Sequence, residues 1–280
     1  VQQRRSQHRI EWLDINYLYM PSIDSLFREK YLEKDENYIL KYNYEDRFIV
    51  RTGYSYIYNS AGRALMNNSG IGNSYTIRLN FESAGNLLYA VAKLGGMKKN
   101  ASGEYTLLNI PFAQYLKGDF DFAKNLVIDN RNSLAFHFGA GIAIPYGNAT
   151  MLPFEKRYFS GGANSVRGWS VRDLGPGSFP GDNNFMNQSG DIKLDASIEY
   201  RTRLFWKFRG ALFVDAGNIW TIRDYKDQPG GQFKFDKFYK QIAVAYGLGL
   251  RLDLDFFVLR FDGGMTVSYT HLRAHETVLD

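Results

Sequence analysis

Apolar residues alternate with polar or small residues along much of the chain, which is the period-two pattern of β-strands rather than the longer period of helices. The alternation is clearest in residues 134–144 and in residues 192–201, where four of the five residues on the polar face are charged. It returns in residues 75–82, 209–216, 242–251 and 257–262, and more weakly in residues 10–19, 48–58, 87–94 and 112–128. We therefore predict an all-β chain with about nine or ten antiparallel strands.

Two folds fit this pattern: a soluble sandwich with one solvated face, and a membrane barrel with an apolar exterior and a polar lumen. The polar faces contain clustered glycines, Gly139, Gly141, Gly247 and Gly249, which suit the narrow interior of a strongly curved sheet. The apolar faces contain Tyr and Phe near the strand ends, as membrane girdles do, and the chain holds 20 Tyr and 21 Phe. The pattern favours the lipid-facing barrel.

Composition excludes several other classes of protein. The formal net charge is only +5 and the charges are scattered, so nucleic acid is not an expected partner. Cysteine is absent, which removes disulfides and thiolate chemistry, and no run of eighteen apolar residues predicts a transmembrane helix. No cofactor, metal site or catalytic constellation is predicted, so we do not expect an enzyme.

One long loop, between the strands predicted at 134–144 and 192–201, carries a glycine-bearing motif. Gly161 and Gly162 permit a tight turn, and Gly168 lets the backbone pass close to another element. Between Val166 and Gly168 lies a single cation, Arg167. A phosphate-binding loop is rejected, because the Gly-Lys-Ser/Thr ending is missing and no helical pattern follows.

Residues 159–169, Phe-Ser-Gly-Gly-Ala-Asn-Ser-Val-Arg-Gly-Trp, resemble the Val-Arg-Gly-aromatic signature of the BamA/TamA-type superfamily of outer-membrane assembly and translocation barrels, also called the bacterial surface antigen family. Residues 198–201, 213–220, 247–251 and 259–262 are similar to that family's following strands. The sequence of the motif is most similar to the family's TamA-like lipoprotein branch. The resemblance covers residues 48–265. It implies the C-terminal part of a transmembrane antiparallel β-barrel, with a long extracellular loop folded into the lumen. The implied loop motif is Gly161, Gly162, Val166, Arg167, Gly168 and Trp169.

The charge of Arg167 needs partners if the loop enters the lumen, because a partly desolvated guanidinium is costly alone. Glu199 and Asp215 lie on the polar faces of the next two predicted strands, and carboxylates suit the planar fork of arginine. The family's arginine is similar in pairing with acidic residues at the matching positions. The alternative is that all three residues are ordinary solvated charges of the lumen.

The resemblance implies a barrel in the bacterial cell outer membrane that inserts or exports other outer-membrane proteins by a non-covalent mechanism. The implied partners are outer-membrane lipids and unfolded client proteins, with periplasmic or lipoprotein subunits as further candidates. The alternatives are a porin-like passive channel or another outer-membrane barrel. An outer-membrane lipase would need a Ser/His pair on the outer face, and His137 belongs to the lumen face.

The chain also departs from the family, whose barrels have about sixteen strands preceded by soluble domains. We expect residues 1–265 to form a partial barrel, with the first strands and the last strand missing from this stretch of a longer protein. Residues 266–280 lack the alternation and are expected to be a tail that does not fit the barrel pattern.

Overall fold

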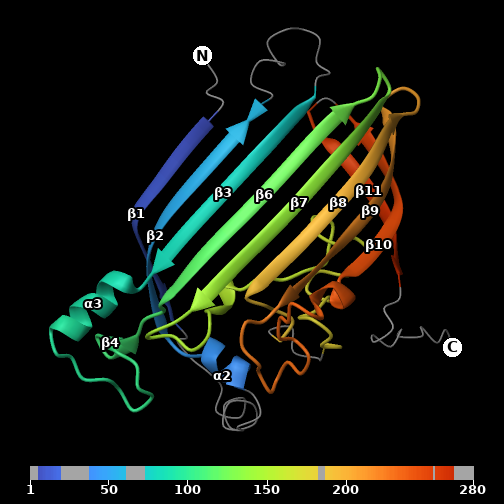
Figure 1. Ribbon diagram of the computed structural model, residues 1–280. Coiled ribbons are helices and arrows are strands. Elements are labelled where there is room, and N and C mark those ends of the chain that lie inside the picture. The colour runs from blue at the N-terminus through green and yellow to red at the C-terminus, as the bar shows by residue number, and fades with distance from the viewer. Residues whose placement is uncertain (1–5, 20–37, 61–72, 182–186, 255, 268–280) are drawn as a thin grey trace.

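A computed structural model describes residues 6–19, 38–60, 73–181, 187–254 and 256–267. Nine strands form a single sheet in the order β1-β2-β3-β6-β7-β8-β9-β10-β11, and every neighbouring pair is antiparallel (Figure 1). The predicted all-β antiparallel fold is therefore confirmed. Within the described residues the sheet does not close, since β1 and β11 each pair with one neighbour only.

The nine strands are long enough to cross a bilayer when tilted, at 10 to 14 residues each. Their bounds are β1 Ser6–Leu18, β2 Arg47–Asn59, β3 Ser74–Ala84, β6 Tyr115–Val127, β7 Asn132–Pro145, β8 Ile192–Arg203, β9 Phe208–Trp220, β10 Ala243–Asp253 and β11 Val258–Val267. The remaining elements are short and lie in the connections: α2 Tyr38–Asn43, α3 Asn86–Leu94, β4 Thr106–Leu107, β5 Ile110–Pro111, η3 Phe154–Lys156 and η4 Phe238–Gln241.

One predicted strand is wrong, because residues 87–94 form the helix α3. Short apolar runs do not separate strand from helix by periodicity alone. In this run the apolar residues Leu87, Val91 and Leu94 fall on one helical face, and all three are exposed. In the part of the chain that the structure describes, no helix combines the length and the apolar character that a bilayer-spanning helix needs.

Side chains alternate between an outer apolar face and an inner polar face. On the outer face the apolar residues Ile198, Val214 and Leu248 are exposed. An exposed apolar band is what the lipid-facing side of a membrane barrel presents. On the inner face Glu199 and Asp215 are buried. The curved sheet therefore has a polar inner face, as the alternation predicts, and we call the space that this face borders the lumen.

The two ends of the sheet differ in their connections. At one end, which we call the turn end, three of the four connections are short, at residues 128–131, 204–207 and 254–257, and the fourth is the longer connection 60–73. At the other, the loop end, the connections 85–114, 146–191 and 221–242 are long and contain α3, η3 and η4. Short turns face the periplasm and long loops face outward in barrels of this kind, so the loop end is the extracellular end.

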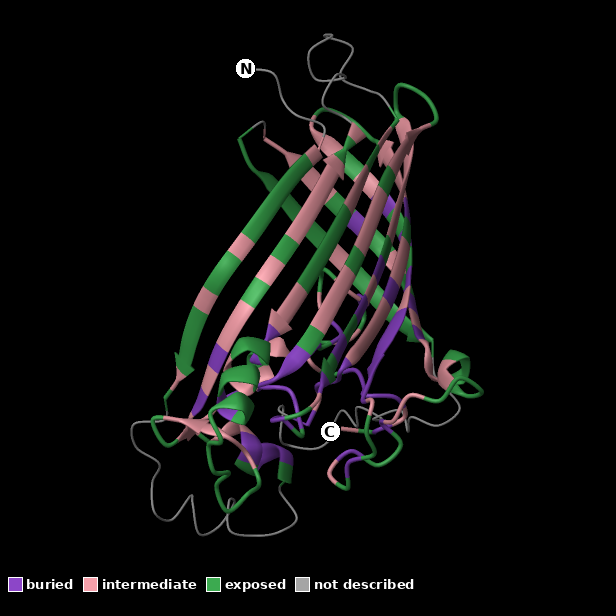
Figure 2. Ribbon diagram, turned by 60° about the vertical axis from the view of Figure 1, so that its left-hand side comes forward, coloured by how far each residue is buried: buried purple, intermediate pink, exposed green. Residues whose placement is uncertain are grey.

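The buried residues gather at the loop end (Figure 2). One cluster joins Ile49 of β2, Tyr115 of β6 and Ile219 of β9 to Leu152 and Tyr158 of the 146–191 loop. This loop therefore supplies part of the protein's core, although η3 is the only helix or strand among its described residues. At the C-terminal side β11 extends to Val267, two residues past the predicted limit of the barrel pattern, and residues 268–280 of the predicted tail lie outside the described residues.

Candidate functional site

The candidate site is the 146–191 loop, which folds back against the inner face of the sheet. Val166 and Leu174 of the loop are buried in a cluster with Ala243 and Ala245 of β10, and Trp169 packs against that cluster. Small residues on β10 leave the space that this packing needs. The loop end of the lumen is therefore filled by the protein's own chain.

The motif residues form a hairpin-like tip within the loop. The Gly162 N–H donates to the Trp169 carbonyl oxygen at 2.8 Å, and the Arg172 N–H donates to the Ser160 carbonyl oxygen at 3.0 Å. Gly161 has φ +96°, and a Cβ there would lie 2.1 Å from the Ser170 carbonyl oxygen. The glycine at this position is thus required by the turn itself.

A second glycine lets the tip approach the wall. Gly168 has φ +118°, and a Cβ there would lie 3.1 Å from Cβ of Ala245 and 3.2 Å from Cγ2 of Thr266. From the other side, a Cβ on Gly264 of β11 would lie 3.0 Å from the Arg167 carbonyl oxygen. Val166, Arg167 and Gly168 consequently lie directly on β10 and β11.

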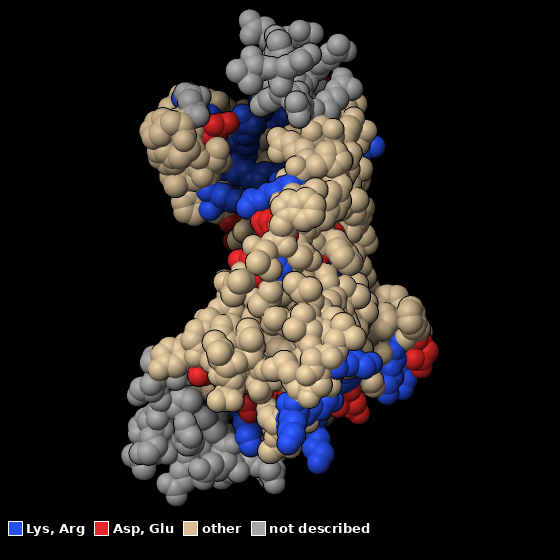
Figure 3. All heavy atoms as spheres, turned by 90° about the vertical axis from the view of Figure 1, so that its left-hand side faces the viewer, with Lys and Arg blue, Asp and Glu red and all other residues tan. Residues whose placement is uncertain are grey.

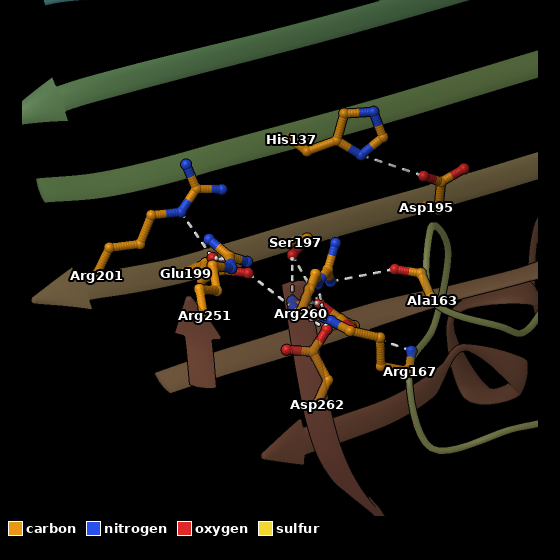
Figure 4. Close-up of polar contacts among 11 residues, drawn as sticks. His137, Ala163, Arg167, Asp195, Ser197, Glu199, Arg201, Arg251, Arg260 and Asp262 are labelled. Carbon is orange, nitrogen blue, oxygen red and sulfur yellow. Dashed lines mark hydrogen bonds and ion pairs between the residues drawn. The ribbon is translucent and has the colours of Figure 1, made fainter. Parts of the chain in front are cut away.

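Arg167 contacts both of the carboxylates expected from the sequence (Figure 4). Its Nε and Nη2 donate to the two oxygens of Asp215 at 2.7 and 2.8 Å, which is the two-pronged arginine–carboxylate geometry. Its Nη1 donates to Oε2 of Glu199 at 2.7 Å. The structure therefore brings Arg167, Glu199 and Asp215 together on three different elements: the loop, β8 and β9.

Further contacts fix the same side chain. The Arg167 backbone N–H also donates to Asp215 Oδ2 at 3.0 Å, and the guanidinium carbon lies 3.5 Å from the centre of the Phe213 ring. Ser197 accepts from Arg167 Nη2 at 3.3 Å and donates to Asp215 Oδ1 at 2.6 Å. With 6% of its side chain exposed, Arg167 is held on every side.

Sequence reasoning missed Ser197, Phe213 and Asp262 as members of this cluster. Asp262 Oδ2 lies 3.6 Å from Arg167 Nη1 and belongs to β11. All three share the inner face with Glu199 and Asp215 in the strand alternation, so the sequence does predict that their side chains point into the lumen. Their contact with Arg167 depends on how deeply the loop inserts, and strand periodicity carries no information on that depth.

The loop is also held on the opposite side of the lumen. Tyr158 donates to Asp119 Oδ1 of β6 at 2.6 Å, and its ring lies over Gly141, where a Cβ would come within 2.7 Å of it. Lys156 Nζ lies 2.8 Å from Glu82 Oε1 of β3. The loop thus crosses the lumen between β3 and β11 and is anchored to both walls.

At its C-terminal root the loop contains a buried ion pair. Arg157 Nε lies 3.4 Å from Asp191 Oδ1, and both side chains are fully buried. Burial raises the pKa of the Asp191 carboxyl above its ordinary value, and the Arg157 guanidinium opposes that rise. The pair joins the start of the motif to the residue directly before β8.

His137 lies on the inner face, as expected, and belongs to a separate polar cluster. Its Nε2 lies 2.6 Å from Asp121 Oδ2, and its Nδ1 lies 3.4 Å from Asp195 Oδ2. Lys193 Nζ completes the group at 3.1 Å from Asp195 Oδ1. The cluster links β6, β7 and β8 through polar side chains of the inner face.

An inward-folded loop pinned by an arginine inside a tilted antiparallel sheet is the arrangement that the resemblance of residues 159–169 implies. The Omp85 superfamily domain matches residues 22–271 of the chain. The chain therefore belongs to the Omp85 superfamily and is an outer-membrane protein.

Named relatives share parts of the sequence. The outer-membrane protein assembly factor BamA of Neisseria meningitidis serogroup B is 32% identical over 96 residues, covering 31% of this chain and 12% of that protein. The sorting and assembly machinery component 50 homolog A of Xenopus laevis is 27% identical over 146 residues, covering 50% of this chain and 30% of that protein. The chain spans less than a third of the length of these curated relatives.

Two solved structures are also similar. BamA from Haemophilus ducreyi lacking POTRA domains 1–3 gives a TM-score of 0.45 at 17% identity, over 80% of this chain and 52% of that one. CdiB from Acinetobacter baumannii gives a TM-score of 0.30 at 13% identity, over 79% of this chain and 44% of that one.

Proposed function

We propose that the full protein inserts or exports other outer-membrane proteins in the bacterial outer membrane, without covalent chemistry. Membership of the Omp85 superfamily supports this, as do the relatives, which are named as an assembly factor and a sorting and assembly component. The proposal includes outer-membrane lipids and unfolded client proteins as partners, together with periplasmic or lipoprotein subunits. It assigns no enzymatic step to any residue.

The proposed mechanism uses strand pairing. A client strand adds to an open edge of the barrel by main-chain hydrogen bonding, and the next client strand then pairs with the first. Such an edge is productive only if the rest of the wall keeps its shape while the seam opens. The motif Gly161, Gly162, Val166, Arg167, Gly168 and Trp169 has this bracing role in our proposal.

The observation that carries the proposal is the set of contacts made by Arg167. The side chain ties the loop to Asp215 of β9 and Glu199 of β8 at 2.7 Å each, and it approaches Asp262 of β11. A single loop residue therefore connects strands across the C-terminal part of the wall. A passive channel has no need for such a connection through its lumen.

The experiment uses the full-length protein in proteoliposomes that receive an unfolded client barrel. Folded client is measured by protease protection and by its heat-modifiable mobility in gels. We expect Arg167→Ala to lower the yield of folded client several-fold, with Arg167→Lys between it and the parent. Lys193→Ala is the matched control, since it removes a lumen cation that does not touch the loop motif.

Two outcomes would contradict the proposal. One is an equal yield of folded client from parent, Arg167→Ala and protein-free liposomes. The other is rapid flux of small solutes through the parent protein without any client folding, which would favour the porin-like channel.

A further inference from the structure

Four arginines lie directly opposite one another on four neighbouring strands. Arg203 of β8 pairs with Arg209 of β9, Arg209 with Arg251 of β10, and Arg251 with Arg260 of β11. Directly opposite residues share a face of the sheet, with Cβ atoms about 5 Å apart. We call these four residues the arginine row.

The arginine row lies on the lumen face, at the turn end. Arg203 and Arg209 are separated from Glu199 and Asp215 by even numbers of residues along β8 and β9, which places them on the same inner face. Arg203 is the last residue of β8, and Arg209 follows in β9 directly after the short turn. The row therefore borders the periplasmic mouth of the lumen. Arg260 also contacts the tip of the inserted loop, since its Nη2 donates to the Ala163 carbonyl oxygen at 3.2 Å, whereas Arg203 and Arg209 lie nearest the turn.

The row is only partly neutralised. Arg209 Nη2 lies 2.6 Å from Asp253 Oδ2, and Arg260 Nε donates a hydrogen bond to Asp262 Oδ2. Arg251 shares Glu199 with Arg201 and Arg167. Within the described residues Arg203 makes no ion pair, and the buried Nε of Arg251 has no hydrogen-bond partner.

The balance of charge around the row is positive. Among the residues that the structure describes, and counting Arg167 and Arg201 with the row, six guanidinium groups face four carboxylates: Glu199, Asp215, Asp253 and Asp262. Like charges placed directly opposite one another on a sheet are destabilising. An uninterrupted row of four is thus a poor choice for stability alone, and it is well suited to attracting an anion.

The lumen beside the row is open. Figure 3 shows Lys and Arg side chains gathered in the hollow between the two edges of the sheet. A cavity of about 230 Å³ between β3, β6, β7 and β8 is lined by the inner-face residues His137, Glu199 and Arg201, among others. The side chains of Arg201 and Arg209 are 41% and 45% exposed, so both can still contact a ligand.

We propose that the arginine row binds a carboxylate-bearing polypeptide segment that enters the lumen from the periplasmic mouth. Neighbouring strands lie about 4.8 Å apart, so the row extends over roughly 14 Å. Carboxylates at alternate positions of an extended chain lie about 7 Å apart, so three of them cover the same distance. The planar fork of each guanidinium binds a carboxylate through two parallel hydrogen bonds.

A carboxylate-bearing chain fits the position of the row better than a lipid headgroup does. The row faces the lumen, whereas lipid contacts the opposite face, where Leu250 and Phe261, the sequence neighbours of Arg251 and Arg260, are exposed. Binding of such a chain at the mouth of the lumen does not depend on whether the barrel assembles, exports or merely conducts.

The test uses the full-length protein in detergent and two fluorescent peptides, one alternating Asp with Thr and one alternating Lys with Thr. Binding is measured by fluorescence anisotropy at low and at high salt. We expect the acidic peptide to bind, the basic peptide not to bind, and the affinity to fall as salt rises. The double variant Arg203→Gln/Arg209→Gln should weaken binding of the acidic peptide by about tenfold or more.

Two further variants keep the test decisive. Arg203→Lys/Arg209→Lys retains the charges and loses the forks, so its affinity should lie between those of the parent and the glutamine variant. Lys193→Gln removes a lumen cation near the other end of β8 and should bind as the parent does. Each protein is first shown to be folded by its heat-modifiable mobility in gels.

The proposal is overturned if the parent binds acidic and basic peptides alike, or if the folded glutamine variant binds the acidic peptide as tightly as the parent. It is also overturned if vesicles of phosphatidylglycerol bind through the row while the acidic peptide does not. That last result would assign the row to lipid phosphate.

Discussion

Arg167 combines three features that make a side chain hard to replace: it is buried, it is charged, and it has two acidic partners on different strands. Asp215 receives two hydrogen bonds from the guanidinium and Glu199 receives one. An ammonium group could satisfy the charge of these carboxylates, but it could not reproduce the planar fork that fits Asp215. The geometry therefore selects arginine and not merely a cation.

Replacing Arg167 should destabilise the seated loop. Arg167→Ala leaves Glu199 and Asp215 close together without their main counter-charge, and breaking a buried pair from one side costs roughly 3–5 kcal/mol. Lumen water and the neighbouring Arg201 and Arg251 lower this cost, so we expect the lower end of the range or less. Arg167→Lys should recover part of the difference.

The measurement is urea unfolding of the full-length protein in detergent, with protease cleavage of the 146–191 loop as a local probe. We expect faster cleavage of the loop in Arg167→Ala than in Arg167→Lys, and the slowest cleavage in the parent. Identical cleavage rates in all three proteins would show that the contacts of Arg167 do not hold the loop in place.

At the scale of secondary-structure elements, most of the fold could be predicted from period two alone. Residues 134–144 and 192–201 fall inside β7 and β8, and even the weakly patterned residues 10–19 and 48–58 largely coincide with β1 and β2. The exception is α3, where a short apolar run at the loop end has no neighbouring strand to pair with. The side of the sheet to which each side chain points could be predicted, because successive residues of a strand alternate between two faces. The insertion of the loop could not, because it depends on three-dimensional packing that no local period encodes.

The two faces of the strands should respond differently to charge. Leu248, at the middle of β10, is 66% exposed on the outer face, so Leu248→Arg should cost about 2–4 kcal/mol in a bilayer. Leu194 lies near the loop end of β8, and the cost of Leu194→Arg should fall toward roughly 0–1 kcal/mol. Lys193→Ala, beside Leu194 on the inner face, should have a mild effect.

These variants are compared by unfolding in phospholipid vesicles and again in detergent micelles. The penalty for Leu248→Arg should be larger in vesicles, because a micelle deforms around a charge more easily than a bilayer does. If Leu248→Arg and Lys193→Ala cost the same in vesicles, the assignment of faces in β10 is wrong.

At the scale of the whole molecule, two separate features promote self-association of these 280 residues on their own. The outer face presents a broad apolar surface that includes Trp12, Leu79 and Phe261. In addition β1 and β11 present strand edges that, within the described residues, pair on one side only. Unpaired edges act as templates for further strands, whatever covers the apolar face.

Detergent separates the two causes, because it covers the apolar face and leaves the strand edges free to pair. We expect the isolated 280 residues to aggregate in plain buffer and, in detergent, to show a β-type circular dichroism spectrum while remaining oligomeric by light scattering. A closed barrel of the full-length protein should be monomeric in the same detergent, since closure removes the edges. A monodisperse, soluble monomer in plain buffer would contradict both the lipid-facing exterior and the open edges, and a helical spectrum would contradict the fold itself.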